Sequence, residues 1–147
     1  MRRPSKRLIV DAAILVAAAT GKTFDLLTSV MAFRELFATQ RAIEETSRRI
    51  ALGWARPNLV ARLRPMIEQF EIVDQALVDG AMPEAIRALR RAPATGNGST
   101  SDAHILAAAW ALDSDIWTHD RDFAGCGVAT WSSANLWAAI MAETETG

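Results

Sequence analysis

The sequence predicts an α/β fold with three layers, in which a central, mostly parallel and twisted sheet lies between two layers of helices. The main observation is that short apolar, β-branched segments alternate along the chain with longer segments of helical periodicity. Half of the 147 residues are hydrophobic and 22% are charged, which is the balance of an ordinary globular domain rather than a disordered chain. The length fits one domain with a sizeable core, so we assign residues 1–147 to a single domain.

The first half of the chain contains two predicted strands and several predicted helices. The segments "RLIVD" at residues 7–11 and "ELFATQ" at residues 35–40 are short and largely apolar, as expected for buried strands. Gly21 is expected to close the first helix, because glycine readily takes the left-handed conformation at a helix end. Pro57 is expected to interrupt helical structure. The helices are expected at residues 12–21, 23–33, 41–55 and 58–70.

The second half continues the alternation of strands and helices. A strand is expected at residues 71–74, and Pro83 is expected in the first turn of a helix over residues 83–92. The low-complexity stretch "PATGNGSTS", residues 93–101, predicts a loop that is too short to link two domains. The remaining elements are a helix at residues 102–114, strands at 115–120 and 127–132, and a helix at 133–143.

Charge and cysteine content exclude several classes of protein. The net charge is −1, so no overall field attracts nucleic acid. Among the 16 basic residues 14 are Arg, whose planar side chain suits phosphate recognition, although genome composition explains the same bias. The single cysteine, Cys126, excludes a disulfide framework and a cysteine-based zinc site, and it favours a reducing, cytoplasmic compartment.

The N-terminus superficially resembles a secretory signal, because a basic start precedes an apolar run. Asp11 argues against this interpretation, since it places a charge in the middle of the run. The run is also shorter than the roughly 20 apolar residues of a membrane-spanning helix. We therefore expect a cytoplasmic protein without membrane association.

Acidic residues stand at the ends of predicted strands and at the start of a predicted helix. Asp11 ends the first strand, Asp120 ends the strand "DIWTHD", and Asp122 lies just beyond it. Asp102 begins an Ala-rich helix, and Glu45 lies one to two turns into the helix after the second strand. Because ligands of parallel sheets bind beyond the carboxyl ends of the strands, we expect these carboxylates to converge on one rim.

Each of these acids also has a purely structural interpretation. Asp11 could cap a helix, Asp102 could complement a helix dipole, Asp120 and Asp122 could form a turn, and Glu45 could face solvent. Together, however, the carboxylates would repel each other strongly unless a cation neutralised them. An all-oxygen cluster suits Mg²⁺ or Mn²⁺, and such a site supports the hydrolysis of phosphodiester bonds.

Two segments of the sequence resemble a known family. "SDAHILAAAWALDSDIWTHDRDF" resembles the C-terminal signature of PIN-domain ribonucleases, which consists of an Asp-Ala helix start, an Ala-rich helix, a strand and then Thr-x-Asp-x-Asp-Phe. "LIVDAAILV" resembles the first strand of that family with its Asp. Within the family, the sequence most resembles the VapC-type toxins of bacterial toxin–antitoxin pairs. The resemblance implies a PIN-like fold and a nuclease activity that depends on Mg²⁺ or Mn²⁺.

The resemblance also implies roles for individual acids. The metal-binding acids of the family correspond to Asp11, Asp102, Asp120 and, as an accessory ligand, Asp122. Its helical glutamate corresponds to Glu45, with Glu44 as the competing choice because the register of that helix is open. The implied catalytic set is therefore Asp11, Glu45, Asp102 and Asp120.

The resemblance and the charge pattern suggest residues that bind substrate. Thr118 corresponds to the hydroxyl that orients the site in the family, and we expect it to contact substrate. Arg87 and Arg91 lie four residues apart on a predicted helix and are candidates for binding RNA phosphates, with a solvated helix face as the alternative. The sequence departs from the family pattern at His119, where a small residue is common, and after Asp11, where two alanines replace polar residues.

The function implied by the resemblance is a metal-dependent endoribonuclease that acts as the toxin of a toxin–antitoxin system. The implied partners are an RNA substrate, an antitoxin protein and a second copy of the chain, which would form a homodimer through the apolar segments 23–33 and 64–70. The alternatives are a PIN-fold interaction module without catalysis and a stand-alone RNA-processing PIN nuclease. A haloacid-type phosphatase is excluded because Ala13 replaces the second Asp, and a receiver domain because the last lysine is Lys22.

Overall fold

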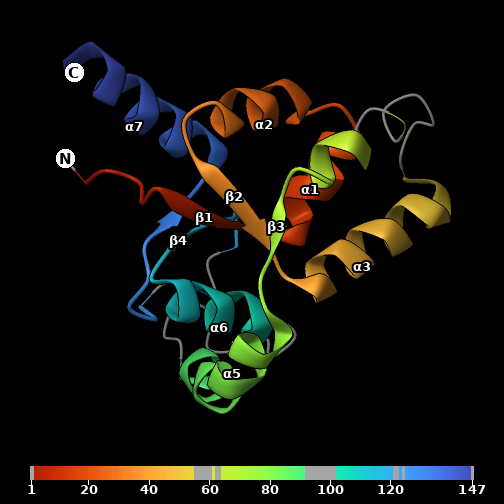
Figure 1. Ribbon diagram of the computed structural model, residues 1–147, viewed down its shortest axis with the longest axis vertical. Helices are drawn as coiled ribbons and strands as arrows, with labels where there is room; N and C mark the ends of the chain where they lie inside the picture. Colours follow the sequence, from red (N-terminus) through yellow and green to blue (C-terminus); the bar gives the residue numbers. More distant parts are fainter. Residues whose placement is uncertain are drawn as a thin grey trace.

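The structure is a computed structural model that describes residues 2–54, 61, 64–91, 102–120, 123 and 125–146. Its strands form one sheet in the order β3-β2-β1-β4-β5, and each pair of neighbouring strands is parallel (Figure 1). The parallel sheet predicted from the sequence is therefore confirmed. The strands are β1 (Arg7–Val10), β2 (Glu35–Ala38), β3 (Glu71–Ile72), β4 (Asp115–Trp117) and β5 (Thr130–Trp131).

Helices cover both faces of the sheet, so the predicted three-layer α/β/α architecture is also confirmed. In Figure 1 the first layer lies above the sheet and the second below it. The first layer consists of α1 (Ala12–Ala19), α2 (Phe24–Met31) and α7 (Ser133–Thr146), and the second of α5 (Gln75–Arg90) and α6 (Ala103–Leu112). Beyond the carboxyl end of β2, α3 (Gln40–Arg49) continues into a single π-helical turn, η1 (Ile50–Trp54).

Side chains that alternate along the strands divide the core into two halves. Leu8 and Val10 of β1 pack with α1, α2 and α7, whereas Ile9 packs with α5 and α6. In β4, Trp117 and Ile116 separate in the same way. Strands covered on both faces are apolar at consecutive positions, which is why short β-branched runs reveal them in the sequence.

The end of α1 lies where the sequence predicts it. Gly21 has a φ of 93°, its N–H donates to the Ala18 carbonyl at 3.0 Å, and the Lys22 N–H donates to the Ala17 carbonyl at 3.1 Å. This pair of hydrogen bonds is the Schellman arrangement, and it requires the left-handed backbone that glycine adopts without strain. Gly21 therefore ends α1 and turns the chain toward α2.

The prediction that Pro83 lies in the first turn of its helix is wrong, because α5 begins at Gln75 and contains Pro83 in its interior. The helix starts earlier because the Asp74 side chain caps it and accepts a hydrogen bond from the Ala76 N–H at 3.0 Å. Pro83 is exposed, so the carbonyl that its missing N–H leaves unpaired can bond to water.

The other predicted elements are found with shifted ends. The helix predicted over residues 41–55 is regular only to Arg49, where the backbone widens into η1, and the strand predicted over 127–132 is shortened to β5. Residues 64–67 of the predicted helix 58–70 are helical, while Pro57 and the predicted loop 93–101 lie outside the described residues. Across the part of the chain that the structure describes, no helix has the length and apolar character needed to cross a membrane.

Candidate active site

The order of the strands changes direction at β1. From β1 the chain adds β2 and β3 on one side, and it later returns to add β4 and β5 on the other side. Such a switch point leaves an opening between the carboxyl ends of the two central strands, and ligands of open parallel sheets bind there. The acids that follow β1 and β4 therefore stand where this type of fold binds ligands.

The hydroxyl of Thr118 holds Asp11 and Asp120 together at this edge. The Asp11 N–H donates to the Trp117 carbonyl at 3.1 Å, which extends the pairing of β1 with β4 by one residue. Thr118 Oγ1 donates to Asp11 Oδ2 at 2.7 Å and accepts a hydrogen bond from the Asp120 N–H at 3.0 Å. The Asp11 side chain makes no capping hydrogen bond to α1. Thr118, which directly follows β4, therefore positions this carboxylate close to the N–H groups at the start of α1.

The Asp11 carboxyl group is buried, with only 7% of the residue exposed. Burial raises the pKa of Asp11 above its ordinary value of 3.8, and the negative charge of Asp120 adds to the rise. The Thr118 hydroxyl and the N–H group of Ala13 at the start of α1 oppose the rise, because both stabilise the ionised form. Asp11 is thus a buried carboxyl group beside a second acid.

Asp102, at the start of α6, completes a group of three aspartates. Burial raises the pKa of Asp102 from 3.8 to about 7, and the rise is increased by the charge of Asp11, a hydrogen bond to Asp120, and the charges of Asp120 and Glu45. Asp102 makes no capping hydrogen bond to α6, so the structure does not use it as a helix cap. The four acids that the sequence predicted as catalytic therefore interact electrostatically in one place.

The helix α3 turns Glu45, and not Glu44, toward this group. Glu45 is half-buried and its charge contributes to the raised pKa of Asp102. Glu44 is exposed, and its Oε1 accepts a hydrogen bond from Gln40 Nε2 at 3.4 Å. Adjacent helical residues point about 100° apart, which separates the two candidates. Of the two alternatives left open by the sequence, Glu45 remains the candidate for the site glutamate.

A comparison with protein-family models agrees with this arrangement. A model of the PIN domain matches residues 9–140, a range that includes Asp11, Glu45, Asp102 and Asp120. The chain belongs to the PIN-domain family. Proteins of this family are in general nucleases, and the fold of the chain is that of a PIN domain.

Solved structures show the same fold at low sequence identity, and no curated protein matches the sequence. VapBC2 from Rickettsia felis, bound to a DNA fragment from its promoter, is 14% identical with a TM-score of 0.63, over 86% of this chain and 98% of that chain. PAE2754 from Pyrobaculum aerophilum is 17% identical with a TM-score of 0.65, over 92% and 96%. FitAcB from Neisseria gonorrhoeae is 12% identical with a TM-score of 0.57, over 88% and 99%. The similarity to VapC-type proteins is thus a similarity of fold.

The side chains in the site of this PIN domain fit a divalent cation. Asp11, Asp102 and Asp120 offer carboxylate oxygens, which are the ligands that Mg²⁺ and Mn²⁺ prefer. None of the ion pairs among the described residues involves Asp11 or Asp102, so no described Lys or Arg neutralises these two carboxylates. Among the described residues, no group of three or more His, Cys, Asp or Glu side chains is arranged to hold a metal ion. Mg²⁺ does not require one, because it is usually held by one or two carboxylates and several waters.

A second hydrogen-bonded pair connects the helices that carry Glu45 and Asp102. Thr39 caps α3 by accepting a hydrogen bond from the Ala42 N–H at 3.1 Å, and its hydroxyl lies 2.6 Å from His104 Nδ1 of α6. Burial, followed by the positive charge of Arg41, lowers the pKa of His104 from 6.5 to about 4. His104 is therefore neutral at pH 7, and its contact with Thr39 joins α3 to α6 beside the acids.

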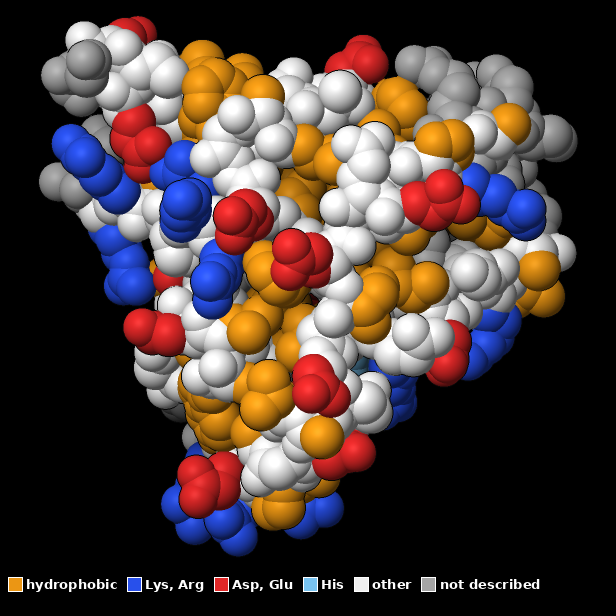
Figure 2. All heavy atoms as spheres, in the orientation of Figure 1, with side chains coloured by type: hydrophobic (Ala, Val, Ile, Leu, Met, Phe, Trp, Pro, Cys, Tyr) orange, Lys and Arg blue, Asp and Glu red, His pale blue; other side chains and the backbone are white. Residues whose placement is uncertain are grey.

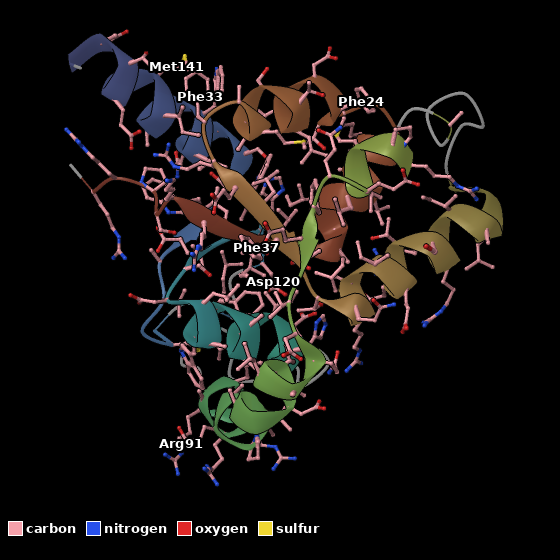
Figure 3. The ribbon with its side chains drawn as sticks, in the orientation of Figure 1. Phe24, Phe33, Phe37, Arg91, Asp120 and Met141 are labelled. Atoms are coloured by element: carbon pink, nitrogen blue, oxygen red, sulfur yellow. The ribbon has the colours of Figure 1, made fainter. Side chains whose placement is uncertain are left out.

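The remaining predicted site residues lie elsewhere or have a different environment. Thr118 is 3% exposed and its hydroxyl bonds to protein groups on both sides, so its position supports orientation of the acids and not contact with substrate. Arg87 is exposed on α5 and lies 3.9 Å from Glu84, and Figure 3 shows Arg91 at the outer end of α5, away from Asp120. Asp122 lies outside the described residues.

Sequence analysis missed the residues that position the acids. Thr39 was assigned to the end of a strand, although a threonine directly before a helix is also the ordinary signal of an N-cap. The contact of His104 with Thr39 has no local signal, because the two residues are 65 positions apart in the sequence. His119 is exposed, and its Nε2 accepts a hydrogen bond from the Ser133 N–H at 3.2 Å, which places this histidine at the start of α7.

Proposed function

We propose that this PIN domain is a metal-dependent endoribonuclease of the VapC type, which uses Mg²⁺ or Mn²⁺ to hydrolyse RNA phosphodiester bonds in the cytoplasm. The proposal assigns metal binding to Asp11, Asp102 and Asp120, with Asp122 as an accessory ligand, and a catalytic role to Glu45. The observation that carries it is the environment of Asp102, whose pKa is raised to about 7 beside two further aspartates and a glutamate. Carboxyl groups kept this close repel one another, and a divalent cation that binds between them relieves the repulsion.

In the proposed mechanism the cation, when bound, activates water and neutralises charge that develops on the scissile phosphate. Thr118 links the Asp11 carboxyl group to the backbone of Asp120 through its two hydrogen bonds. The contact between Thr39 and His104 fixes α3 against α6, and hence Glu45 relative to Asp102. Glu45 is less buried than Asp11, and we assign to it the acceptance of a proton from the attacking water.

The ends of the cleavage products test this mechanism. Water attack at phosphorus leaves a 5′-phosphate and a 3′-hydroxyl, whereas attack by the ribose 2′-hydroxyl leaves a cyclic phosphate. We expect the first pair of ends from a single-stranded RNA incubated with Mg²⁺ or Mn²⁺, and no cleavage in EDTA. Cyclic phosphate ends, or full activity in EDTA, would contradict the mechanism. A chain that binds RNA in the presence of metal but never cuts it would instead be a PIN-fold interaction module.

The proposal extends to a protein partner that regulates the nuclease. The VapBC2 structure is described as bound to a DNA fragment from its promoter, and this chain has the same fold as that protein at 14% identity. We propose that the partner is an antitoxin whose side chains block the acidic site. Growth arrest on expression of the chain alone, relieved by expression of the product of a directly adjacent gene, is the expected result. Unimpaired growth with active enzyme in the cell would favour a stand-alone RNA-processing nuclease.

The proposal includes a homodimer. The two apolar segments expected to pair meet at one surface hollow, between α2 and residues 65–69. The residues lining this hollow are Phe24, Thr28, Met31, Ala32, Pro65, Met66 and Gln69. A hollow with this lining offers apolar area to a second copy of the chain. Light scattering at tens of micromolar, about the upper range of common working concentrations, should give the mass of a dimer, and the mass of a monomer would contradict the proposal.

A further inference from the structure

The helix α3 has three faces with different surroundings. Ala42 and Thr46 are buried and form the face that packs on the rest of the protein. Ile43 and Ile50 lie on a second face and line a cavity with residues of the 64–68 segment. At 100° per residue, Arg41, Glu45 and Arg48 fall within an arc of about 60° on the third face. Since the charge of Glu45 acts on Asp102, this third face is the one turned toward the acidic site.

Two arginines therefore flank the glutamate of the proposed active site. Arg41 lies about one turn before Glu45 and Arg48 about one turn after it, which separates the two arginines by about 10 Å along the axis at 1.5 Å per residue. Both side chains are exposed. Figure 2 shows Lys and Arg side chains along the lower side of α3, which faces α5 and α6.

Within the described part of the chain, no neighbouring acid forms an ion pair with these arginines. Arg2, Arg7, Arg34 and Arg87 each form an ion pair with an Asp or Glu. Among the described residues, neither Arg41 nor Arg48 forms one, although Glu45 lies within one turn of each on the same helix. Helical neighbours at such spacings commonly pair. The two guanidinium groups thus remain available for an anion that approaches Glu45.

We infer that Arg41 and Arg48 form an RNA-binding stripe on α3, which holds the phosphates on either side of the scissile bond. The inference rests on the proposed nuclease function and replaces the predicted phosphate patch at Arg87 and Arg91 on α5. A planar guanidinium binds two phosphate oxygens at once, and an extended strand that passes Glu45 presents phosphates in both directions along α3. The stripe also offsets the negative potential of the four acids, which would otherwise repel the substrate.

Binding of a labelled RNA tests the stripe without relying on cleavage. The probe is a single-stranded oligoribonucleotide of mixed sequence and about 12 nucleotides, within the size range of single-strand binding sites. Every protein carries Asp102→Asn, so that the probe is not cut and the repulsion between the acids is reduced. One variant adds Arg41→Gln and Arg48→Gln, and the matched control adds Arg87→Gln and Arg90→Gln on α5. Gln and Arg have similar helix propensities, so the helices should be preserved, and thermal melts check this.

The stripe predicts a loss of affinity in the α3 variant alone. Loss of two phosphate contacts should make the salt dependence of log K shallower by about 1.4 and weaken binding about 10- to 30-fold at ~0.1 M salt. The α5 control should bind RNA within about twofold of its parent, since it removes no phosphate contact. Equal affinity of the α3 variant and its parent, or a larger loss in the α5 control, would overturn the inference.

A cleavage assay separates this inference from the proposed function. With Asp102 intact, Arg41→Gln and Arg48→Gln should raise KM about as much as they weaken binding and change kcat less, because the arginines hold phosphates that do not react. If the parent cleaves no RNA with any divalent metal, the proposed function fails, while the binding comparison still decides whether the stripe exists. If the parent cleaves and the α3 variant has an unchanged KM, the stripe is refuted and the nuclease stands.

Discussion

Two buried aspartates stand at opposite ends of the same pair of central strands. Asp11 follows β1 at the carboxyl edge, Asp115 begins β4 at the amino edge, and each is 7% exposed. Asp115 Oδ2 accepts hydrogen bonds from the Ser5 N–H at 3.0 Å and from Trp131 Nε1 at 2.9 Å, and Arg2 lies 3.6 Å from Asp115 Oδ1. The protein itself thus supplies the hydrogen-bond donors and the positive charge that stabilise the Asp115 carboxylate.

The surroundings of Asp11 are the opposite. Among the described side chains, the Thr118 hydroxyl donates a hydrogen bond to Asp11, and the charges that interact with Asp11 are those of the acids Asp120 and Asp102. The two aspartates are therefore equally buried, but Asp115 has an arginine and hydrogen-bond donors beside it, whereas Asp11 has other acids beside it. Burial alone does not distinguish a structural carboxylate from a functional one, whereas the charge of its neighbours does.

The largest expected effect is on catalysis. Asp102→Asn should lower cleavage at least ~1,000-fold, equivalent to about 4 kcal/mol of transition-state stabilisation, because it removes a proposed metal ligand and keeps the shape of the side chain. Asp115→Asn, the matched change at the amino edge, should leave kcat within a few-fold of the parent. Initial rates on one RNA at saturating Mn²⁺ measure both. Comparable losses of cleavage rate in the two variants would show that the carboxyl edge and the amino edge do not differ in function.

The second expected effect is the response of stability to metal. Mg²⁺ or Mn²⁺ at 100 times its Kd should raise the free energy of unfolding by about 2.7 kcal/mol, because the cation binds only the folded state. The increase should shrink in Asp102→Asn and persist in Asp115→Asn. Thermal melts in EDTA and across a metal titration give the shift. If neither metal changes the Tm of the parent chain, the acids do not form a cation site.

The third expected effect is on the stability of the metal-free protein. Asp115→Asn should reduce the free energy of unfolding by about 1–3 kcal/mol, since a buried group that accepts two hydrogen bonds loses its charge. Asp102→Asn should leave the metal-free protein as stable as the parent or more stable, because it relieves repulsion. Urea titrations in EDTA compare the two. Greater destabilisation by Asp102→Asn than by Asp115→Asn would make Asp102 the structural residue.

The fourth expected effect is a dependence of stability on pH. The pKa of Asp102 is about 7 in the folded protein and 3.8 as the ordinary value, so the folded state holds a proton that the unfolded state has lost between these pH values. The metal-free protein should therefore become less stable as the pH rises from about 4 through 7. The raised pKa of Asp11 acts in the same direction. Denaturation curves across this range give the free energy of unfolding at each pH. This free energy should depend less on pH in Asp102→Asn than in the parent. An unchanged pH dependence in that variant would assign the effect to another group.

The fold and the acids could be predicted because both follow from local signals. β-Branched runs mark strands covered on two faces, and the carboxyl ends of parallel strands meet at one edge, so Asp11 and Asp120 could be placed together from the sequence. Gly21 marked a helix end for an equally local reason. The roles assigned to these acids remain predictions, and Asp122 lies outside the described residues.

What could not be predicted depends on partners that are distant in the sequence or on competing local signals. Thr39 and His104 meet only after α3 and α6 have packed at the edge of the sheet. Pro83 favours a helix start, but α5 begins eight residues before it, where Asp74 caps the helix and Val78 is buried. The assignment of Arg87 and Arg91 to RNA binding stays a prediction, because helical spacing does not show which edge of the sheet a helix approaches.

The pairing of β1 with β4 also bears on how the protein is made. Leu8 pairs with Asp115, so the two central strands are joined by a connection of about a hundred residues, and Asp11 and Asp120 are 109 positions apart. At 5–20 residues per second, a ribosome needs roughly 5 to 20 s to synthesise the chain between these two acids. Until this interval ends Asp11 exists without Asp120, and for most of it also without Asp102. Non-local pairing of this kind also folds slowly. The nascent chain therefore has no complete acidic site, and a cell that makes this protein has several seconds in which any partner can be produced before the nuclease is assembled.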